Sequence, residues 1–200
     1  MVQKEFWKKQ NNMKIRLAID EIQRDSIVDG EGIRTVIWTQ GCSHHCPYCH
    51  NPETHSYKGG FLVDIEDIEK KIDSLEGQDG ITFSGGDPME QPLACSVLAK
   101  YCHQKKLNVW CYTGYTFEEL LEKINLNPDI LEFLKQIDIL VDGKFVYQQK
   151  SYDVIFRGSK NQRLIDVKKS LIKRETVLYQ AGNQDVKSVK GRSQKHLLYV

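Results

Sequence analysis

The stretch Ile33–Asn51, IRTVIWTQGCSHHCPYCHN, carries more structural information than any other part of this sequence of 200 residues. Its first seven residues are rich in β-branched and aromatic side chains, which is typical of a buried β-strand. The polar loop that follows contains three cysteines, Cys42, Cys46 and Cys49, at the spacing C-x3-C-x2-C. A strand that leads three thiols into one short loop predicts a metal or redox site at the end of that strand.

The chain beyond this loop alternates between short apolar runs and apolar residues at helical spacing, which predicts repeated strand–helix units. The expected strands cover residues 33–39, 80–84, 107–112 and 137–141. One expected helix begins at the N-cap Asp64, and a second carries the apolar stripe Leu93, Val97, Leu98 and Tyr101. A third begins at the capping-box pair Thr116 and Glu119, and a fourth covers residues 129–136. Polar residues gather at the ends of these strands, where parallel α/β sheets bind ligands. We therefore expect an α/β fold with its site at this edge.

The composition is that of an ordinary globular domain, with 40% hydrophobic and 28% charged residues. The 28 Lys and Arg residues nearly balance the 27 Asp and Glu residues, so bulk charge favours neither a nucleic acid nor a membrane as partner. No stretch approaches the roughly 18 apolar residues of a membrane span. Because Met1–Met13 lacks the apolar region of a signal peptide, we expect a cytoplasmic protein whose cysteines stay reduced.

The two ends of the chain are more basic than its centre. Residues 1–16 hold five basic groups and one acidic group, and residues 167–200 hold eight and two. We expect a basic N-terminal extension at 1–16, a single core domain at 17–180 and a mobile basic tail at 181–200. Solvated ends are favoured over nucleic-acid arms, because charge runs of this kind are usually solvated.

Three thiolates can hold one face of a cubane 4Fe-4S cluster, which takes four cysteine ligands when its coordination is complete. No fourth cysteine lies nearby, so one iron would keep an open position of the kind that metal catalysis uses. Structural zinc, held by the three cysteines and His50 or a neighbouring histidine, is the alternative. Zinc ligands usually come in two separated pairs, and the sequence has no second pair.

The remaining cysteines fall within predicted helices or strands, where we expect them to pack as small apolar side chains. They are Cys95, Cys102 and Cys111. A disulfide within the cysteine loop would leave one thiol unpaired, and a reducing compartment would not support it.

The cysteine triplet, with Tyr48 before its last member, resembles the C-x3-C-x-aromatic-C signature of the radical S-adenosylmethionine (SAM) superfamily. The turn Phe83–Pro88, FSGGDP, is similar to the superfamily's Gly-Gly-Glu motif, which binds the amino group of SAM. Glycines let the backbone approach a ligand closely, and a carboxylate pairs with an ammonium group. The resemblance implies a single domain folded as a partial, open (βα) barrel that binds a 4Fe-4S cluster and SAM.

The stretch DGEGIRTV at 29–36 resembles a segment of the activases of glycyl-radical enzymes. Further motifs narrow the resemblance within that group to the activating proteins of anaerobic ribonucleotide reductases. These motifs are Asp87 in place of glutamate, WCYTGY at 110–115, and VDGKF at 141–145 followed by RGSKNQR at 157–163. The resemblance extends from about residue 20 to residue 179. The absence of an inserted ferredoxin-like domain between these motifs separates the sequence from larger activases.

The resemblance implies a role for each matching residue. The implied cluster ligands are Cys42, Cys46 and Cys49. The implied SAM contacts are Tyr48 and His50 beside the adenine with Cys49 between them, Gly85, Gly86 and Asp87 at the methionyl ammonium group, and Tyr112, Thr113 and Gly114 on the ribose side. No side chain is expected to act as an acid or base.

The implied reaction is the one-electron reduction of SAM to methionine and a 5′-deoxyadenosyl radical, with flavodoxin or ferredoxin as electron donor. The radical would then take a hydrogen atom from a glycine in the large subunit of the anaerobic reductase. Two alternatives stay within the superfamily: an activase of another glycyl-radical enzyme, such as pyruvate formate-lyase, and a small-molecule enzyme of the 7-carboxy-7-deazaguanine synthase type. A zinc-stabilised interaction module is the alternative outside it.

Overall fold

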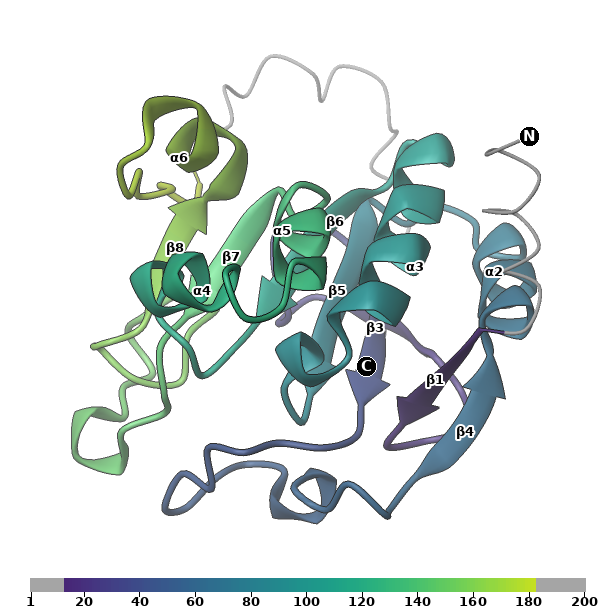
Figure 1. Ribbon diagram of the computed structural model, residues 1–200, viewed down its shortest axis with the longest axis horizontal. Helices are drawn as coiled ribbons and strands as arrows, with labels where there is room; N and C mark the ends of the chain where they lie inside the picture. Colours follow the sequence, from purple (N-terminus) through teal and green to yellow (C-terminus); the bar gives the residue numbers. More distant parts are fainter. Residues whose placement is uncertain (1–12, 183–200) are drawn as a thin grey trace, which may run out of the picture.

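One mixed sheet of eight strands organises the chain in the computed structural model, which describes residues 13–182 (Figure 1). The strands are β1 (Lys14–Leu17), β2 (Gln23–Ser26), β3 (Arg34–Thr39), β4 (Phe61–Asp64), β5 (Gly80–Gly85), β6 (Asn108–Tyr112), β7 (Ile139–Asp142) and β8 (Arg163–Asp166). The α-helices of the described residues are α2 (Ile65–Asp73), α3 (Pro92–Gln104), α4 (Phe117–Lys123), α5 (Asp129–Leu134) and α6 (Val167–Lys173). These elements form a mixed α/β fold in a single domain, as the sequence predicts.

The centre of the sheet is parallel. The strand order is β4-β1-β3-β5-β6-β7-β8, and β2 pairs with β3 beside this path. The pairs β3–β5, β5–β6 and β6–β7 are parallel, whereas the pairs on the flanks are antiparallel. Thr39 at the end of β3 lies opposite Gly85 at the end of β5. The loops after the four parallel strands therefore leave the same edge of the sheet, which we call the carboxyl edge.

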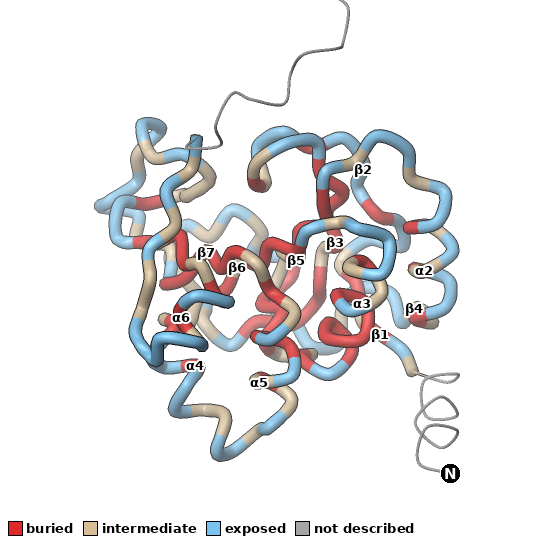
Figure 2. Tube along the Cα trace, turned by 90° about the horizontal axis from the view of Figure 1, so that it is seen from above, coloured by how far each residue is buried: buried red, intermediate tan, exposed pale blue. Residues whose placement is uncertain are grey.

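Helices cover one face of the sheet, and aromatic side chains pack on the other. Ile68 of α2 and Leu98 of α3 are fully buried in the larger core, which lies between the helices and the sheet. On the other face Trp110 packs against the rings of Phe156 and Tyr179, with ring centroids 5.3 and 5.9 Å away. Figure 2 shows the buried segments gathered along the central strands and α3.

Arg34 occupies the interior at the opposite, amino-terminal edge of the sheet. Its fully buried guanidinium donates hydrogen bonds to Thr82 Oγ1 at 2.6 Å and to Asn108 Oδ1 at 2.8 Å. It also donates to the carbonyl oxygen of Ile81 at 2.7 Å and lies 5.3 Å from the centroid of the Trp110 ring. Burial lowers the pKa of Arg34 to about 10, so the group stays charged at neutral pH.

Two predicted helix starts differ in how they are capped. The capping box of α4 is confirmed, because Thr116 Oγ1 accepts from the backbone N–H of Glu119 and the Glu119 carboxylate accepts from the N–H of Thr116. Asp64 precedes α2 as predicted, but its side chain makes no cap hydrogen bond. Pairing of β1 with β4 places Lys14 opposite Asp64, and the carboxylate binds that ammonium group at 2.9 Å instead.

The predicted core residues are mostly buried. Val97 and Leu98 of the α3 stripe are buried, whereas Leu93 is 44% exposed. The expectation of buried apolar packing is confirmed for the three cysteines outside the loop, which are each 0% exposed: Cys95, Cys102 and Cys111.

The ends of the described chain are both attached to the fold. β1 joins the sheet at Lys14, so the expected extension at 1–16 overlaps this strand. Near the other end, the hydroxyl of Tyr179 and the backbone N–H of Gly182 each donate to the Glu31 carboxylate at 2.6 Å. Residues 1–12 and 183–200, with most of both predicted extensions, lie outside the described residues. Over residues 13–182, no helix combines the length and the apolar character that crossing a membrane requires.

Candidate metal and cofactor site

A cavity of about 140 Å³ opens at the carboxyl edge of the sheet. It is lined by the loops after β3, β5, β6 and β7, and Figure 1 shows the loops after β3 and β7 extending from the same end of the molecule. The structure brings together at this cavity nine of the residues that the sequence singles out: Cys42, Cys46, Cys49, His50, Gly85, Gly86, Tyr112, Thr113 and Gly114. Their meeting follows from the parallel pairing, which brings the ends of β3, β5, β6 and β7 side by side.

The three loop cysteines are free thiols on the wall of this cavity. Desolvation raises the pKa of Cys42 to about 11, and burial also raises the pKa of Cys46. Both side chains are therefore protonated at neutral pH when no metal is bound. Because thiolates are the metal-binding form, binding of iron would release protons from this loop.

The cysteine loop is held by its own backbone. The N–H of Gly41 donates to the carbonyl oxygen of Thr54 at 2.8 Å, and the N–H of Cys42 donates to that of His55 at 3.1 Å. Two non-glycine residues turn the chain at positive φ, His45 at 47° and Tyr48 at 58°. These turns at the residues before Cys46 and Cys49 direct the loop around the cavity, so the local conformation is set by contacts within the loop.

The double glycine is required by close backbone packing. A side chain on Gly85 would place its Cβ 2.5 Å from the carbonyl oxygen of Thr39, and Gly85 has a φ of +101°. A Cβ on Gly86 would lie 2.3 Å from the carbonyl oxygen of Gly41. The turn after β5 can therefore lie against the start of the cysteine loop only if both residues are glycine.

Asp87 joins three of the loops around the cavity. Its carboxylate, 1% exposed, accepts hydrogen bonds from the N–H groups of Met89 and Gly114, both at 2.9 Å. The hydroxyl of Thr113 donates to both carboxylate oxygens, at 2.9 and 3.0 Å, and His44 Nε2 lies 2.7 Å from Oδ2. Because an ionised carboxylate only accepts, Nε2 carries the proton of the imidazole. These four donors occupy the hydrogen-bonding positions of the carboxylate.

His44 is the link between the cysteine loop and the turn after β6. Its ring contacts the Tyr115 ring edge to face, with centroids 4.3 Å apart. A Cβ on Gly114 would lie 2.3 Å from an atom of the His44 ring, so glycine is needed there for the ring to fit. Beside it, Ser43 Oγ donates to the Glu90 carboxylate at 2.6 Å. The three-residue spacer between Cys42 and Cys46 therefore carries structural contacts of its own.

The loop after β7 forms the remaining wall. Its motif RGSKNQR ends in Gln162 and Arg163, and the buried Gln162 side chain ties the loop together. The Gln162 amide donates to the carbonyl oxygen of Gly143 at 3.0 Å and accepts from the N–H of Gly158 at 2.8 Å. Phe145 is thereby held against the ring of His50, with centroids 4.7 Å apart.

Comparison with known proteins bears directly on this site. The family model of the 4Fe-4S single cluster domain matches residues 28–165, which include every motif around the cavity. The anaerobic ribonucleoside-triphosphate reductase-activating protein of Haemophilus influenzae is 32% identical over 145 residues, which are 68% of this chain and 89% of that protein. The protein of that name from Escherichia coli K12 is 35% identical over 146 residues, 68% of this chain and 90% of its own length. The chain belongs to the family of anaerobic ribonucleoside-triphosphate reductase-activating proteins.

The family extends beyond bacteria. The activating protein of that name from Enterobacteria phage T4 is 30% identical over 151 residues, which are 72% of this chain and 91% of the phage protein. The family assignment confirms the resemblance that the motifs carry.

Two residues singled out by the sequence are not on the wall of the cavity in this activating protein. Tyr48 is 73% exposed, and its ring stacks on Tyr147 with centroids 4.4 Å apart. Asp87 lies buried behind the wall, saturated by protein donors. A direct contact between Asp87 and a ligand ammonium group would require the carboxylate to exchange one of those donors.

Several residues that shape the site carry no signal that sequence reasoning used. His44 and Ser43 stand in the variable spacer of the cysteine motif, and Glu90 follows the double-glycine turn without a motif of its own. Phe145 and Gln162 lie in strings that mark the family, but their contacts depend on the loop after β7 folding back onto the cysteine loop.

Proposed function

We propose that this activating protein is a radical SAM enzyme that reductively cleaves SAM and generates the glycyl radical of an anaerobic ribonucleotide reductase. The observation that carries the proposal is one cavity that gathers three free thiols and a double-glycine turn at the carboxyl edge of a parallel sheet. The names of the relatives and the 4Fe-4S family match support it.

The donor set fits a 4Fe-4S cluster with one open iron. Cys42, Cys46 and Cys49 would hold the cluster, and the other three cysteines are buried within α3 and β6, away from the cavity wall. The open position would take the amino and carboxylate groups of SAM. When bound, the cluster and SAM supply the one-electron chemistry that cleaves the sulfonium bond.

The residues of the chain would orient these groups and exclude water. We place His50 beside the adenine, and Tyr112, Thr113 and Gly114 on the ribose side of the cavity. Gly85 and Gly86 would bring the backbone close to the methionyl ammonium group, while Asp87 would hold that turn in position. Tyr48, which stands between the cavity-lining Cys46 and Cys49, remains a proposed contact of the adenine, and its ring stacks on Tyr147.

The remaining parts of the proposal concern fold type, partners and setting. The open sheet with three consecutive parallel pairs is consistent with the partial (βα) barrel of the radical SAM superfamily. The macromolecular substrate would be the glycyl-radical domain of the reductase large subunit. Flavodoxin or ferredoxin would supply the electron in a reducing cytoplasm.

The test is reconstitution with iron and sulfide under anaerobic conditions, followed by SAM, a reductant and the anaerobic reductase. We expect bound iron and sulfide, release of 5′-deoxyadenosine, and a glycyl doublet in the electron paramagnetic resonance spectrum of the reductase. Bound zinc without iron–sulfur absorption would overturn the proposal. A doublet only on another glycyl-radical enzyme, or turnover of a small molecule alone, would assign the chain to one of the alternatives.

Substitution of one cysteine tests the ligand set. Cys42→Ser should remove the visible iron–sulfur absorption and SAM cleavage together, because a thiolate ligand is lost. Cys102→Ala is the matched control, because Cys102 is fully buried in α3. This variant should keep the full iron content of the parent protein. Iron analysis of the two variants checks both expectations, and retention of the cluster by Cys42→Ser would contradict the assignment.

A further inference from the structure

Basic side chains are concentrated on the loop after β7, which contributes Phe145 to the cavity wall. Several helical lysines are paired with carboxylates, as in Lys70–Asp67 at 2.8 Å and Lys135–Glu132 at 2.7 Å. On the loop after β7, three exposed lysines have no carboxylate within 4.0 Å among residues 13–182: Lys144, Lys150 and Lys160. These charges are therefore available to a partner.

The unpaired lysines lie on a loop that packs directly on the cysteine loop. Phe145 contacts His50, and Tyr147 contacts Tyr48, through ring stacking. The partly buried Cys46 and Cys49 thus lie beside a surface that is both aromatic and positively charged, with Tyr48 73% and Tyr147 48% exposed. We call the surface of Tyr48, Tyr147, Lys144, Lys150 and Lys160 the basic rim.

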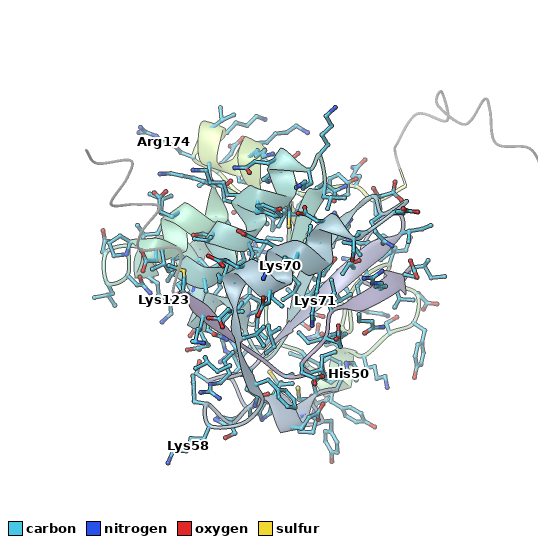
Figure 3. The ribbon with its side chains drawn as sticks, turned by 90° about the vertical axis from the view of Figure 1, so that its right-hand side faces the viewer. His50, Lys58, Lys70, Lys71, Lys123 and Arg174 are labelled. Atoms are coloured by element: carbon cyan, nitrogen blue, oxygen red, sulfur yellow. The ribbon has the colours of Figure 1, made fainter. Side chains whose placement is uncertain are left out.

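The charge of this loop contrasts with that of the molecule around it. Residues 144–163 contain five basic residues and one acidic residue, whereas residues 17–166 as a whole carry more acidic than basic groups. Figure 3 shows His50 in the lower part of the molecule and Lys70 and Lys71 above it, near the centre of the view. A positive patch on an acidic body orients an acidic partner during approach and repels it from other faces.

We propose that the basic rim is the docking surface for an acidic electron-carrier protein, which delivers one electron to the cluster beside Cys46 and Cys49. This inference rests on the proposed function and deepens it by giving the donor a place on the surface. The carrier loses one electron from its reduced cofactor, the iron–sulfur cluster gains that electron, and no proton or bond need move. Weak encounters of electron carriers use small, charged surfaces, and long exposed lysines on one loop are suited to such an encounter.

The experiment compares a protein donor with a small-molecule donor. The double variant Lys150→Glu/Lys160→Glu, reconstituted anaerobically, is reduced either by flavodoxin hydroquinone or by photoreduced deazaflavin in a stopped-flow spectrometer. We expect the second-order rate with flavodoxin at low salt to fall at least tenfold, on the order expected for electrostatic steering. Its salt dependence should weaken, and the rate with deazaflavin should stay unchanged.

The matched control is Lys70→Glu/Lys106→Glu, which changes the same net charge on α2 and after α3, away from the carboxyl edge. Flavodoxin should reduce the cluster of this control variant at close to the parental rate. An unchanged flavodoxin rate in the rim variant, or an equal fall in the control, would overturn the proposal. A normal flavodoxin rate with a lost glycyl signal would assign the rim to the reductase and overturn it too. Absence of a reducible cluster from the parent protein would instead refute the proposed function, and this inference with it.

Discussion

Asp87 shows how the surroundings of one residue change the role that its motif suggests. The motif implies contact between this carboxylate and a ligand ammonium group, but the side chain is buried and fully hydrogen-bonded. The partner His44 comes from the cysteine loop, so the carboxylate links the double-glycine turn to the loop that carries the three cysteines. We therefore expect Asp87 to act on SAM binding through the position of these loops.

A double-mutant cycle separates this role from direct contact. Asp87→Ala and His44→Ala should each weaken SAM binding by about tenfold, the scale of one hydrogen bond to a charged group. The double variant should bind about as weakly as either single variant, which corresponds to a coupling of about 1.4 kcal/mol. Equilibrium dialysis of the reconstituted protein with labelled SAM measures the three affinities.

The control for this cycle is His103→Ala, since His103 lies at the end of α3 and contacts the carbonyl oxygen of Gln136. It should bind SAM as the parent does. If Asp87 instead pairs with the ammonium group directly, His44→Ala will leave the affinity unchanged, and the positioning role is wrong.

Among single residues, the sequence identifies the site residues whose role follows from their spacing to near neighbours in the chain. The three cysteines lie close together along the chain and the two glycines are adjacent to each other, and the structure brings all five to one cavity. The burial of Asp87 could not be predicted, because its donors His44 and Gly114 lie 43 and 27 residues away along the chain.

Helix α4 begins directly after the turn that borders the cavity, so its start fixes that turn. The capping box of Thr116 and Glu119 satisfies two backbone groups at this start. Thr116→Ala should lower the free energy of unfolding by about 1 kcal/mol, the usual value of a lost cap. Asp64→Ala is the matched control, because Asp64 has the same position before α2 but makes no cap hydrogen bond.

Denaturation in urea measures both variants. The control should lose less than about 0.5 kcal/mol, as is usual for an exposed ion pair. Equal losses in the two variants would contradict the difference in capping.

Among the elements, prediction succeeds where the pattern is local and fails where a strand depends on its neighbours. The central strands have continuous apolar runs, and α2 and α4 have clear start signals. In contrast, β2 has the sequence QRDS with three of four residues exposed. It is a strand only because β3 provides hydrogen-bonding partners. The short antiparallel strands β1, β4 and β8 escape prediction for the same reason.

An ion-pair network connects β8 with α4 and β7. Arg163 donates to the Glu118 carboxylate of α4 at 2.6 Å and also pairs with the buried Asp142 at the end of β7. Thr176 Oγ1 donates to Glu118 at 2.6 Å. The Arg163 guanidinium holds the pKa of Glu118 down to about 2, below its ordinary value of 4.5.

This lowered pKa makes the free energy of unfolding depend on pH in the acidic range. A carboxyl group with a lower pKa in the folded state stabilises the fold above its ordinary value and loses that contribution as pH falls through the folded value. The free energy of unfolding should therefore decrease as pH falls from about 4.5 to 2. Glu118→Gln should make this decrease shallower, whereas Glu122→Gln, exposed on the same helix, should follow the parent. Urea unfolding at several pH values in this range measures the free energy of unfolding of the three proteins. If this free energy falls equally with pH in all three, the stabilising role of Glu118 is wrong.

At the scale of the whole molecule, the α/β fold could be predicted from the repeated strand–helix pattern, but the packing on the sheet face opposite the helices could not. The packing of Trp110 against Phe156 and Tyr179 joins segments from three distant parts of the chain. No periodicity in one segment indicates which distant ring will pack on it.

The packing of Trp110 against Tyr179 also borders a second hollow of the molecule. This hollow of about 640 Å³ lies at the far end of the sheet, and it shares no lining residue of the described chain with the cavity of the cysteines. Trp110 lines this second hollow, and the Arg34 guanidinium lies 5.3 Å from the centroid of its ring. A large protein partner that covers the cavity of the cysteines would hinder the passage of small molecules at the carboxyl edge. We therefore expect small ligands of this cavity to exchange after such a partner dissociates.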